Sequence, residues 1–303
     1  CLVERVPTRD VITDARGLEN TMQVGIMSGM FKRPTLGEAL DAILDHDIRY
    51  LQFNLSSLNL KGPLSEKLDA ASAMVSPQIE KRGMTIAAMA GQANMVDPVP
   101  EKRREGIERI KLFIAACADI GTSVLATCTG SRNPENMWRT HPDNDTDETW
   151  EVLCDTLAEL LPHAEAHGVT LAFEPEVCQV ASSAAKSRRL IDDMGSPNLK
   201  VVMDAANIFG KGDLARMREV LDEAFRLLGD HIAIAHAKDL DHDGDSGHLA
   251  AGTGMLDYER YVSLLCGLPF DVPVILHGLS VDQVGESAGM LRDLAKTHAG
   301  SRA

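Results

Sequence analysis

The sequence predicts a closed (β/α)₈ barrel, the TIM barrel, built as a single domain. Eight short apolar segments alternate with longer segments that have charged faces, an order typical of strand–helix units in one parallel sheet. Four metal-ligand-type residues end four successive apolar segments, at separations of 30, 32 and 41 residues. One unit of such a barrel takes roughly 31 residues. We therefore expect a barrel over residues 22–303, preceded by an N-terminal extension over residues 1–21.

The predicted strands are short, almost wholly apolar and rich in β-branched residues, as strands buried on both faces should be. We expect them at Gln23–Met27, Arg49–Asn54, Thr85–Met89, Ser123–Cys128, Thr170–Phe173, Lys200–Met203, Ile232–Ala235 and Pro273–Leu276. A doubly wound open sheet is the alternative. It would string the four metal-ligand candidates along one edge, and no glycine-rich nucleotide-binding motif follows any of the strands.

The segments between the strands carry helix signals. Thr35–Glu38 is a capping box that predicts the start of the first helix. The segment Glu101–Ile120 has apolar residues at helical spacing and stops at Gly121, and the segment Trp150–His167 does the same and stops at Gly168. Glycine directly after a helical pattern is a common helix terminator.

Composition and charge narrow the functional classes. The chain has 303 residues, of which 44% are hydrophobic, and a formal net charge of −15. This charge argues against a nucleic-acid partner, because a phosphate backbone requires a basic face. No apolar run approaches the roughly 18 residues that a membrane span requires, and residues 1–20 lack the apolar segment of a secretory signal. Six cysteines without paired spacing predict buried thiols and a cytoplasmic protein. Monomer and homo-oligomer are both compatible with this composition.

Four residues at the carboxyl ends of predicted strands indicate a metal centre. They are Glu174, Asp204, His236 and His277. In a (β/α)₈ barrel these strand ends converge on the active site, so two carboxylates and two imidazoles would meet there. Such mixed ligation suits Mn²⁺, Co²⁺, Fe²⁺ or Zn²⁺ better than Mg²⁺ or Ca²⁺. We expect one divalent ion, with Mn²⁺ as the first choice.

The connection after the fourth strand, residues 128–144, is too long for a simple turn, and long loops at this end of a barrel are usually functional. Trp138 offers a flat apolar surface that could stack on a sugar ring. Arg132, Arg139 and His141 offer charge and hydrogen bonds. In the alternative interpretation, Arg139 merely holds the loop together with Asp143.

The connection after the seventh strand is strongly acidic. Asp241, Asp243 and Asp245 form a charged run that could simply be solvated. Their alternate spacing resembles a calcium-binding loop, but the glutamate expected at the twelfth position is missing.

Several of these motifs resemble one family. His236-Ala-Lys-Asp239, together with Glu174 and Asp204, resembles the xylose-isomerase-like TIM barrels, and the segment from Cys128 to Asn144 resembles one branch of that family. The resemblance extends over Met22 to His298. It implies an isomerase or epimerase that acts on sugars or sugar phosphates.

The resemblance also implies roles for individual residues, with two departures. The family typically binds its metal through Glu, Asp, His and Glu, which correspond to Glu174, Asp204 and His236, but the last position is His277 here. The second departure is Asn207, where some epimerases have a histidine; we assign it to substrate binding. Because the family's two glutamates exchange a proton between the two faces of a sugar carbon, the second base is missing in this chain.

We therefore predict a divalent-metal-dependent isomerase or epimerase that removes a proton beside a carbonyl and passes through an enediolate. Glu174 is the expected base, with Glu176 and His141 as second choices, while Lys238 and Asp239 orient ligands or donate to a substrate oxygen. The alternative is a metal-dependent lyase or dehydratase acting on a keto-sugar or keto-cyclitol, because elimination needs only one base and an acid. A non-catalytic sugar-binding barrel and a DNA-repair nuclease fit less well, the latter because of the acidic charge.

Overall fold

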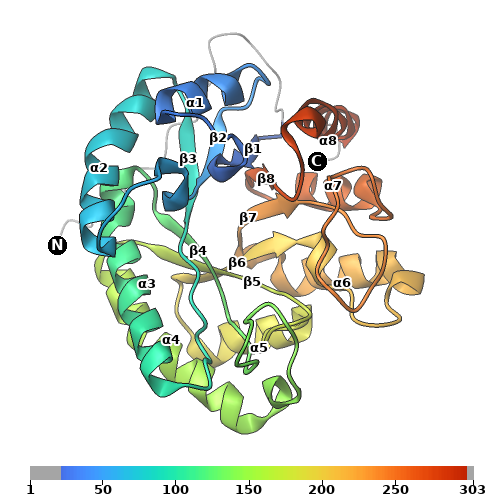
Figure 1. The fold of residues 1–303 in the computed structure, drawn as a ribbon. Helices are drawn as coiled ribbons and strands as arrows, with labels where there is room; N and C mark the ends of the chain where they lie inside the picture. The colour runs from blue at the N-terminus through green and yellow to red at the C-terminus, as the bar shows by residue number, and fades with distance from the viewer. Residues whose placement is uncertain (1–21, 299–303) are drawn as a thin grey trace, which may run out of the picture.

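The computed structural model describes residues 22–298, in which eight parallel strands form a closed barrel enclosed by helices (Figure 1). Each strand pairs with its neighbour in sequence, and the first pairs with the last. The strands are β1 (Val24–Met27), β2 (Tyr50–Phe53), β3 (Thr85–Ala90), β4 (Val124–Cys128), β5 (Thr170–Glu174), β6 (Leu199–Asp204), β7 (Ile232–Ala237) and β8 (Val274–Leu276). The predicted fold class and all eight predicted strands are confirmed. The predicted extension at residues 1–21 lies outside the described residues.

Eight α-helices within residues 22–298 cover the outside of the barrel (Figure 1). They are α1 (Leu36–Leu44), α2 (Leu64–Lys81), α3 (Pro100–Ile120), α4 (Asp147–Ala166), α5 (Ala184–Met194), α6 (Met217–Leu228), α7 (Tyr258–Cys266) and α8 (Val284–His298). Every helix in residues 22–298 is too short or too polar to span a bilayer.

The predicted helix signals hold, with one correction. The Thr35 hydroxyl accepts the Glu38 N–H (3.2 Å) and the Glu38 carboxylate accepts the Thr35 N–H (3.0 Å), so the capping box is formed. Helix α3 ends at Ile120 and is capped by Gly121, whose φ of +100° favours glycine. The predicted start of α4 at Trp150 is wrong, because the hydroxyl of Thr146 caps the helix and α4 begins at Asp147.

The inside of the barrel is filled by a layer of small and branched side chains. One residue from each of six strands belongs to this cluster, namely Ala88, Ala126, Ala172, Val202, Ile234 and Ile275. Side chains in a strand alternate between two faces, so residues two positions further along each strand also point inward. At the carboxyl ends of β5 to β8 these residues are Glu174, Asp204, His236 and His277, the last of which directly follows β8. The apolar layer therefore forms the floor beneath the four predicted ligands.

The prediction that the cysteines are buried is confirmed for three of the five cysteines within residues 22–298. Cys117, Cys128 and Cys178 are buried, whereas Cys154 and Cys266 are only partly buried. Cys1 lies outside the described residues.

Candidate metal centre and active site

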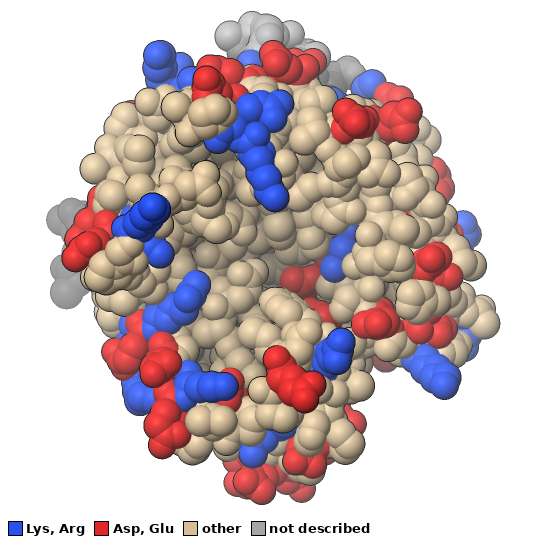
Figure 2. Space-filling model, in the orientation of Figure 1, with Lys and Arg blue, Asp and Glu red and all other residues tan. Residues whose placement is uncertain are grey.

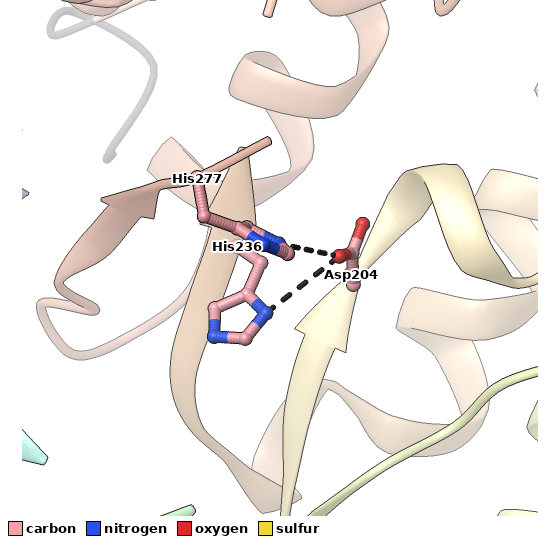
Figure 3. Close-up of side chains that lie close together, drawn as sticks. All are labelled: Asp204, His236 and His277. Atoms are coloured by element: carbon pink, nitrogen blue, oxygen red, sulfur yellow. Dashed lines mark hydrogen bonds and ion pairs between the residues drawn. The ribbon is translucent and has the colours of Figure 1, made fainter. Parts of the chain in front are cut away.

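Asp204, His236 and His277 lie together at the carboxyl end of the barrel (Figure 3). The Asp204 Oδ2 atom lies 3.1 Å from His277 Nε2 and 3.6 Å from His236 Nδ1. The two imidazole rings meet edge to face with their centroids 4.5 Å apart. One ligand-type atom from each of the three residues lies within 4.8 Å of the other two. The register places Asp204 directly beside His236, so neighbouring strands assemble the cluster without help from a loop.

Glu174 joins this cluster through His236. Its Oε1 atom lies 3.7 Å from His236 Nδ1, and the same oxygen accepts a hydrogen bond of 2.5 Å from the Asn207 side-chain amide. The other end of Asn207 accepts the N–H of Gly247 at 3.0 Å. Asn207 is buried, and its contacts make it the residue that fixes the position of Glu174. Its assignment to substrate binding remains a prediction.

The surroundings of Asp204 favour its ionised, negatively charged form. This carboxylate is fully buried; its Oδ1 accepts the N–H of Ala206 (3.0 Å), and the Lys238 ammonium lies 3.3 Å from its Oδ2. Burial by itself raises the pKa of Asp204, but Lys238 and the two imidazoles outweigh it. They hold the pKa well below its usual range. Asp204 is therefore a carboxylate in the form that binds cations.

The two imidazoles are held in different electrostatic environments. Burial opposes protonation of His236, but the carboxylates of Glu174 and Asp204 outweigh burial and raise the pKa of His236 to about 9. For His277, burial and the neighbouring His236 together lower the pKa. Both effects favour the neutral imidazole, which is the ligating form of histidine.

The residues present fit a divalent metal ion. Within residues 22–298, His236 Nδ1 is buried without a hydrogen-bond partner. Its distances of 3.6 and 3.7 Å to Asp204 and Glu174 are too long for hydrogen bonds. A buried polar atom without a partner is costly unless something else satisfies it. Nitrogen and carboxylate donors facing one point would hold Zn²⁺, Mn²⁺, Co²⁺ or Fe²⁺.

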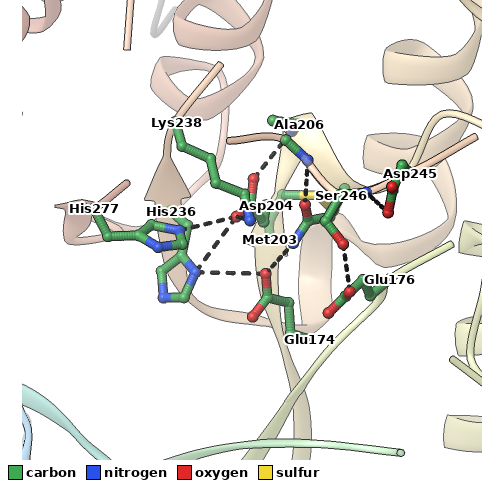
Figure 4. Close-up of polar contacts among 12 residues, drawn as sticks. Glu174, Glu176, Met203, Asp204, Ala206, His236, Lys238, Asp245, Ser246 and His277 are labelled. Carbon is green, nitrogen blue, oxygen red and sulfur yellow. Dashed lines mark hydrogen bonds and ion pairs between the residues drawn. The ribbon is translucent and has the colours of Figure 1, made fainter. Parts of the chain in front are cut away.

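Lys238 lies beside the carboxylates, as predicted from its position. It is nearly buried, and burial alone lowers the pKa of its ammonium. Asp204 and Glu174 outweigh that effect, so the net shift of the Lys238 pKa is upward. Lys238 is therefore a fixed positive charge and a hydrogen-bond donor at the rim of the cluster (Figure 4).

The predicted ligand-orienting role of Asp239 is wrong. Its buried carboxylate accepts the backbone N–H groups of Leu240 (2.9 Å), Gly252 (3.0 Å) and Leu256 (2.9 Å). Asp239 lies one residue beyond Lys238 in an extended segment and therefore points to the opposite face. It organises the connection between β7 and α7.

Glu176 forms a second buried carboxylate near Glu174 (Figure 4). One of its oxygens accepts the Ser246 hydroxyl and the other accepts the Gln179 amide at 3.3 Å. Burial and the nearby Glu174 raise the pKa of Glu176 to about 7. Neither Ser246 nor Gln179 was identified from the sequence, because both lie in loops whose fold decides their contacts.

The connection after β4 is held by its own buried polar side chains. The hydroxyl of Ser131 donates to the Arg139 carbonyl at 2.7 Å, and the amide of Asn144 donates to the Cys178 carbonyl at 3.0 Å. Arg132 donates to the Val96 carbonyl at 3.3 Å. Arg139 thus takes part in closing the loop, but through its backbone rather than its charge.

The side chains predicted to touch substrate from this loop are largely at the surface. Trp138 is 41% exposed, and Arg139 is exposed as well. His141 is partly exposed, and its Nδ1 accepts the N–H of Asp143 at 3.3 Å, which caps a short 3₁₀ helix. The described structure thus does not bring His141 into contact with the four strand-end residues. The space-filling view in Figure 2 shows a hollow at the centre of the molecule.

The acidic connection after β7 is only partly a solvated charge run. Asp241 is exposed and forms a surface cluster with His242 and His248. Asp243 instead accepts the backbone N–H groups of Gly212 (2.9 Å) and Leu214 (3.0 Å), which ties this connection to the one after β6.

The fold and the cluster define a (β/α)₈ barrel with carboxylate and imidazole side chains gathered at the carboxyl ends of β5 to β8. The family model described as "Xylose isomerase-like TIM barrel" matches residues 40–294, and the chain belongs to this family. No curated protein matches the sequence.

Solved structures with the same fold include several sugar epimerases. A D-tagatose 3-epimerase-like protein is 14% identical, with a TM-score of 0.71 over 92% of this chain and 99% of its own. The 3-keto-D-glucoside 4-epimerase from E. coli is 16% identical, with a TM-score of 0.70 over 90% of this chain and 99% of its own. The IOLI protein, solved with a bound zinc atom, is 17% identical, with a TM-score of 0.67 over 91% of this chain and 99% of its own. At these identities the likeness establishes the fold.

Proposed function

We propose that the protein is a divalent-metal-dependent isomerase or epimerase of sugars or sugar phosphates. The observation that carries this proposal is the buried cluster of Asp204, His236 and His277, with Glu174 beside it, at the carboxyl end of the barrel. Membership of the xylose isomerase-like family supports it. So do the names of two similar structures, a D-tagatose 3-epimerase-like protein and a 3-keto-D-glucoside 4-epimerase.

The residues of this chain divide the proposed chemistry between them. Glu174 takes the proton from the carbon beside the substrate carbonyl. Asn207 holds Glu174 through Oε1, so Oε2 is the oxygen that would receive the proton. Lys238 donates a hydrogen bond to the substrate oxygen on which negative charge develops in the enediolate. A divalent ion held by Glu174, Asp204, His236 and His277 would supply positive charge beside the same carbonyl.

A second function is favoured by His277. The family position of the second glutamate carries an imidazole here, and its Nε2 is directed at Asp204. A site with one carboxylate base and one acid can eliminate water from a keto-sugar or keto-cyclitol, whereas two-base epimerisation needs a donor on the opposite face. A metal-dependent lyase or dehydratase is therefore the alternative, with Glu174 as the base and Lys238 as the acid.

Metal analysis followed by a deuterium-exchange screen tests the proposal. The purified protein should contain a single divalent ion. In D₂O it should introduce deuterium beside the carbonyl of at least one keto-sugar in a panel of phosphorylated and unphosphorylated substrates. An isomerised or epimerised product would support the first function, and a dehydrated product the second. Neither bound metal after reconstitution nor exchange with any substrate would contradict both.

Trp138→Ala is expected to weaken turnover without harming the fold. The ring is exposed on a loop whose base is held by buried hydrogen bonds, so its loss removes a stacking surface for a sugar ring and little packing. Losing that surface should lower kcat/KM about ten-fold, the equivalent of about 1.4 kcal/mol. Met255→Ala is the matched control, because Met255 is exposed (57%) on the other long connection. An unchanged kcat/KM in Trp138→Ala would make the loop a structural or interface element.

A further inference from the structure

Gln52 is a buried polar side chain whose neighbours at inward positions of the adjacent strands are apolar. It lies on β2, is fully buried, and pairs in register with Met27 of β1 and Ala88 of β3. Among the described residues, the inward positions at the ends of β1, β3 and β4 carry Met27, Ala90 and Cys128. A buried amide in such surroundings requires partners, because desolvation of an unpaired amide is costly.

The partner of Gln52 lies across the barrel. Its Oε1 is 2.8 Å from Nε2 of His236, although β2 and β7 are not neighbouring strands. A carbonyl oxygen only accepts hydrogen bonds, so His236 Nε2 must carry the hydrogen and donate it. The other ring nitrogen, Nδ1, then faces Glu174 and Asp204 at 3.7 and 3.6 Å.

The amide of Gln52 is satisfied only at its oxygen. Within residues 22–298, its Nε2 is buried without a hydrogen-bond partner. An unpaired buried donor destabilises a fold by about 1–3 kcal/mol, so an apolar side chain of similar shape would suit the fold at least as well. The presence of an amide here is therefore explained by what its oxygen does for His236 rather than by stability.

We propose that Gln52 is a positioning residue of the metal centre: its amide oxygen holds His236 with hydrogen on Nε2 and presents Nδ1 as the nitrogen that binds the ion. This inference rests on the proposed metal-dependent function. The ring nitrogen that a metal ligand uses is generally set by the hydrogen bond of its other nitrogen. The Tyr261 hydroxyl, 2.9 Å from the His236 carbonyl, helps to fix the backbone of the same residue.

Gln52→Met and Gln52→Glu separate this role from a structural one. Methionine matches the shape of glutamine but offers no strong acceptor, so the affinity of the metal-free protein for Zn²⁺, measured by calorimetry, should fall about 10–100-fold. The midpoint of urea unfolding in EDTA should stay the same or rise, because the unpaired amide donor is gone. Gln52→Glu keeps an acceptor oxygen and should retain more Zn²⁺ affinity than Gln52→Met.

Thr127→Val is the matched control. Thr127 is buried on β4 and its hydroxyl also lacks a hydrogen-bond partner within residues 22–298. Its replacement removes the same kind of unpaired group away from His236. It should leave Zn²⁺ affinity unchanged. Wild-type Zn²⁺ affinity in Gln52→Met, or an equal loss in Thr127→Val, would overturn the proposal.

Nitrogen-15 NMR of labelled histidines in the metal-free protein tests the role of Gln52 without relying on metal binding. Wild-type His236 should show a protected Nε2–H that is lost in Gln52→Met and kept in Thr127→Val. If the wild-type protein bound no Zn²⁺, the metal-dependent function would fail, while a protected Nε2–H that depends on Gln52 would still support the positioning of His236. Absence of that protected signal from the wild-type protein would overturn the inference about Gln52.

Discussion

Glu174→Gln is expected to abolish exchange of deuterium between solvent and a keto-sugar substrate. The amide oxygen of glutamine can still accept the hydrogen bond of Asn207 and face His236, but an amide cannot accept a proton as a base. The loss of a general base typically costs about 10²–10⁴-fold in rate. Metal content, measured on the same preparation, should fall only modestly, because a carbonyl oxygen can still ligate.

Glu176→Gln is the matched control for this experiment. It makes the same substitution two residues later, in a buried carboxylate whose side-chain partners within residues 22–298 are Ser246 and Gln179. We expect Glu176→Gln to keep measurable exchange. Full exchange in Glu174→Gln together with loss in Glu176→Gln would move the base to Glu176 and favour the lyase over the isomerase.

The positions of the four strand-end residues could be predicted because they depend on local features. Buried parallel strands have a distinctive apolar composition, and the barrel places the residue after each such segment at a common end. Asp204 and His236 illustrate this, since each follows a clear strand signal and the register then sets them side by side. No knowledge of loop conformation was required.

Gln52 could not be predicted in the same way. It is a single polar residue in the strand Tyr50–Phe53, and its partner His236 is 184 residues away in the sequence. Only the closure of the barrel brings the two strands to opposite sides of one interior. The alternation of side chains along the strand does indicate that Gln52 points into the barrel. A buried glutamine is expected to have a hydrogen-bond partner, but the alternation does not say which residue it is.

Lys238 and Asp239 are neighbours in the sequence but make their contacts on opposite sides of the segment that follows β7. Both were expected near the ligands, yet adjacent residues of an extended segment point to opposite faces. Lys238 lies two residues after His236, so it points to the same face, and it contacts Asp204. Asp239 instead accepts hydrogen bonds from backbone N–H groups of its own loop. The contact between Asn207 and Glu174 could not be predicted. It depends on the conformation of the loop that follows β6, and no sequence pattern indicates that conformation.

Asp204→Asn is expected to have two large and separable effects. It replaces the anionic oxygen that contacts both His236 and His277 with a neutral amide oxygen, whereas Glu174 contacts only His236 of the two. Affinity for Zn²⁺ should therefore fall further than in Glu174→Gln, roughly 100-fold or more. It also leaves the buried ammonium of Lys238 without its nearest partner. Removing one member of a buried ion pair typically costs about 3–5 kcal/mol of stability. Calorimetry with Zn²⁺ and urea unfolding in EDTA measure the two effects.

The double variant Asp204→Asn/Lys238→Met separates ligation from folding. Without the uncompensated ammonium, most of the lost stability should return, while Zn²⁺ affinity should stay low because the negative charge between the two imidazoles is still missing. Asp239→Asn is the control for charge removal at a neighbouring buried aspartate, and it should lower stability through its loop while Zn²⁺ binding persists. If the double variant regained Zn²⁺ affinity together with stability, Asp204 would act as the counter-ion of Lys238 and the metal would be held by the other residues of the cluster.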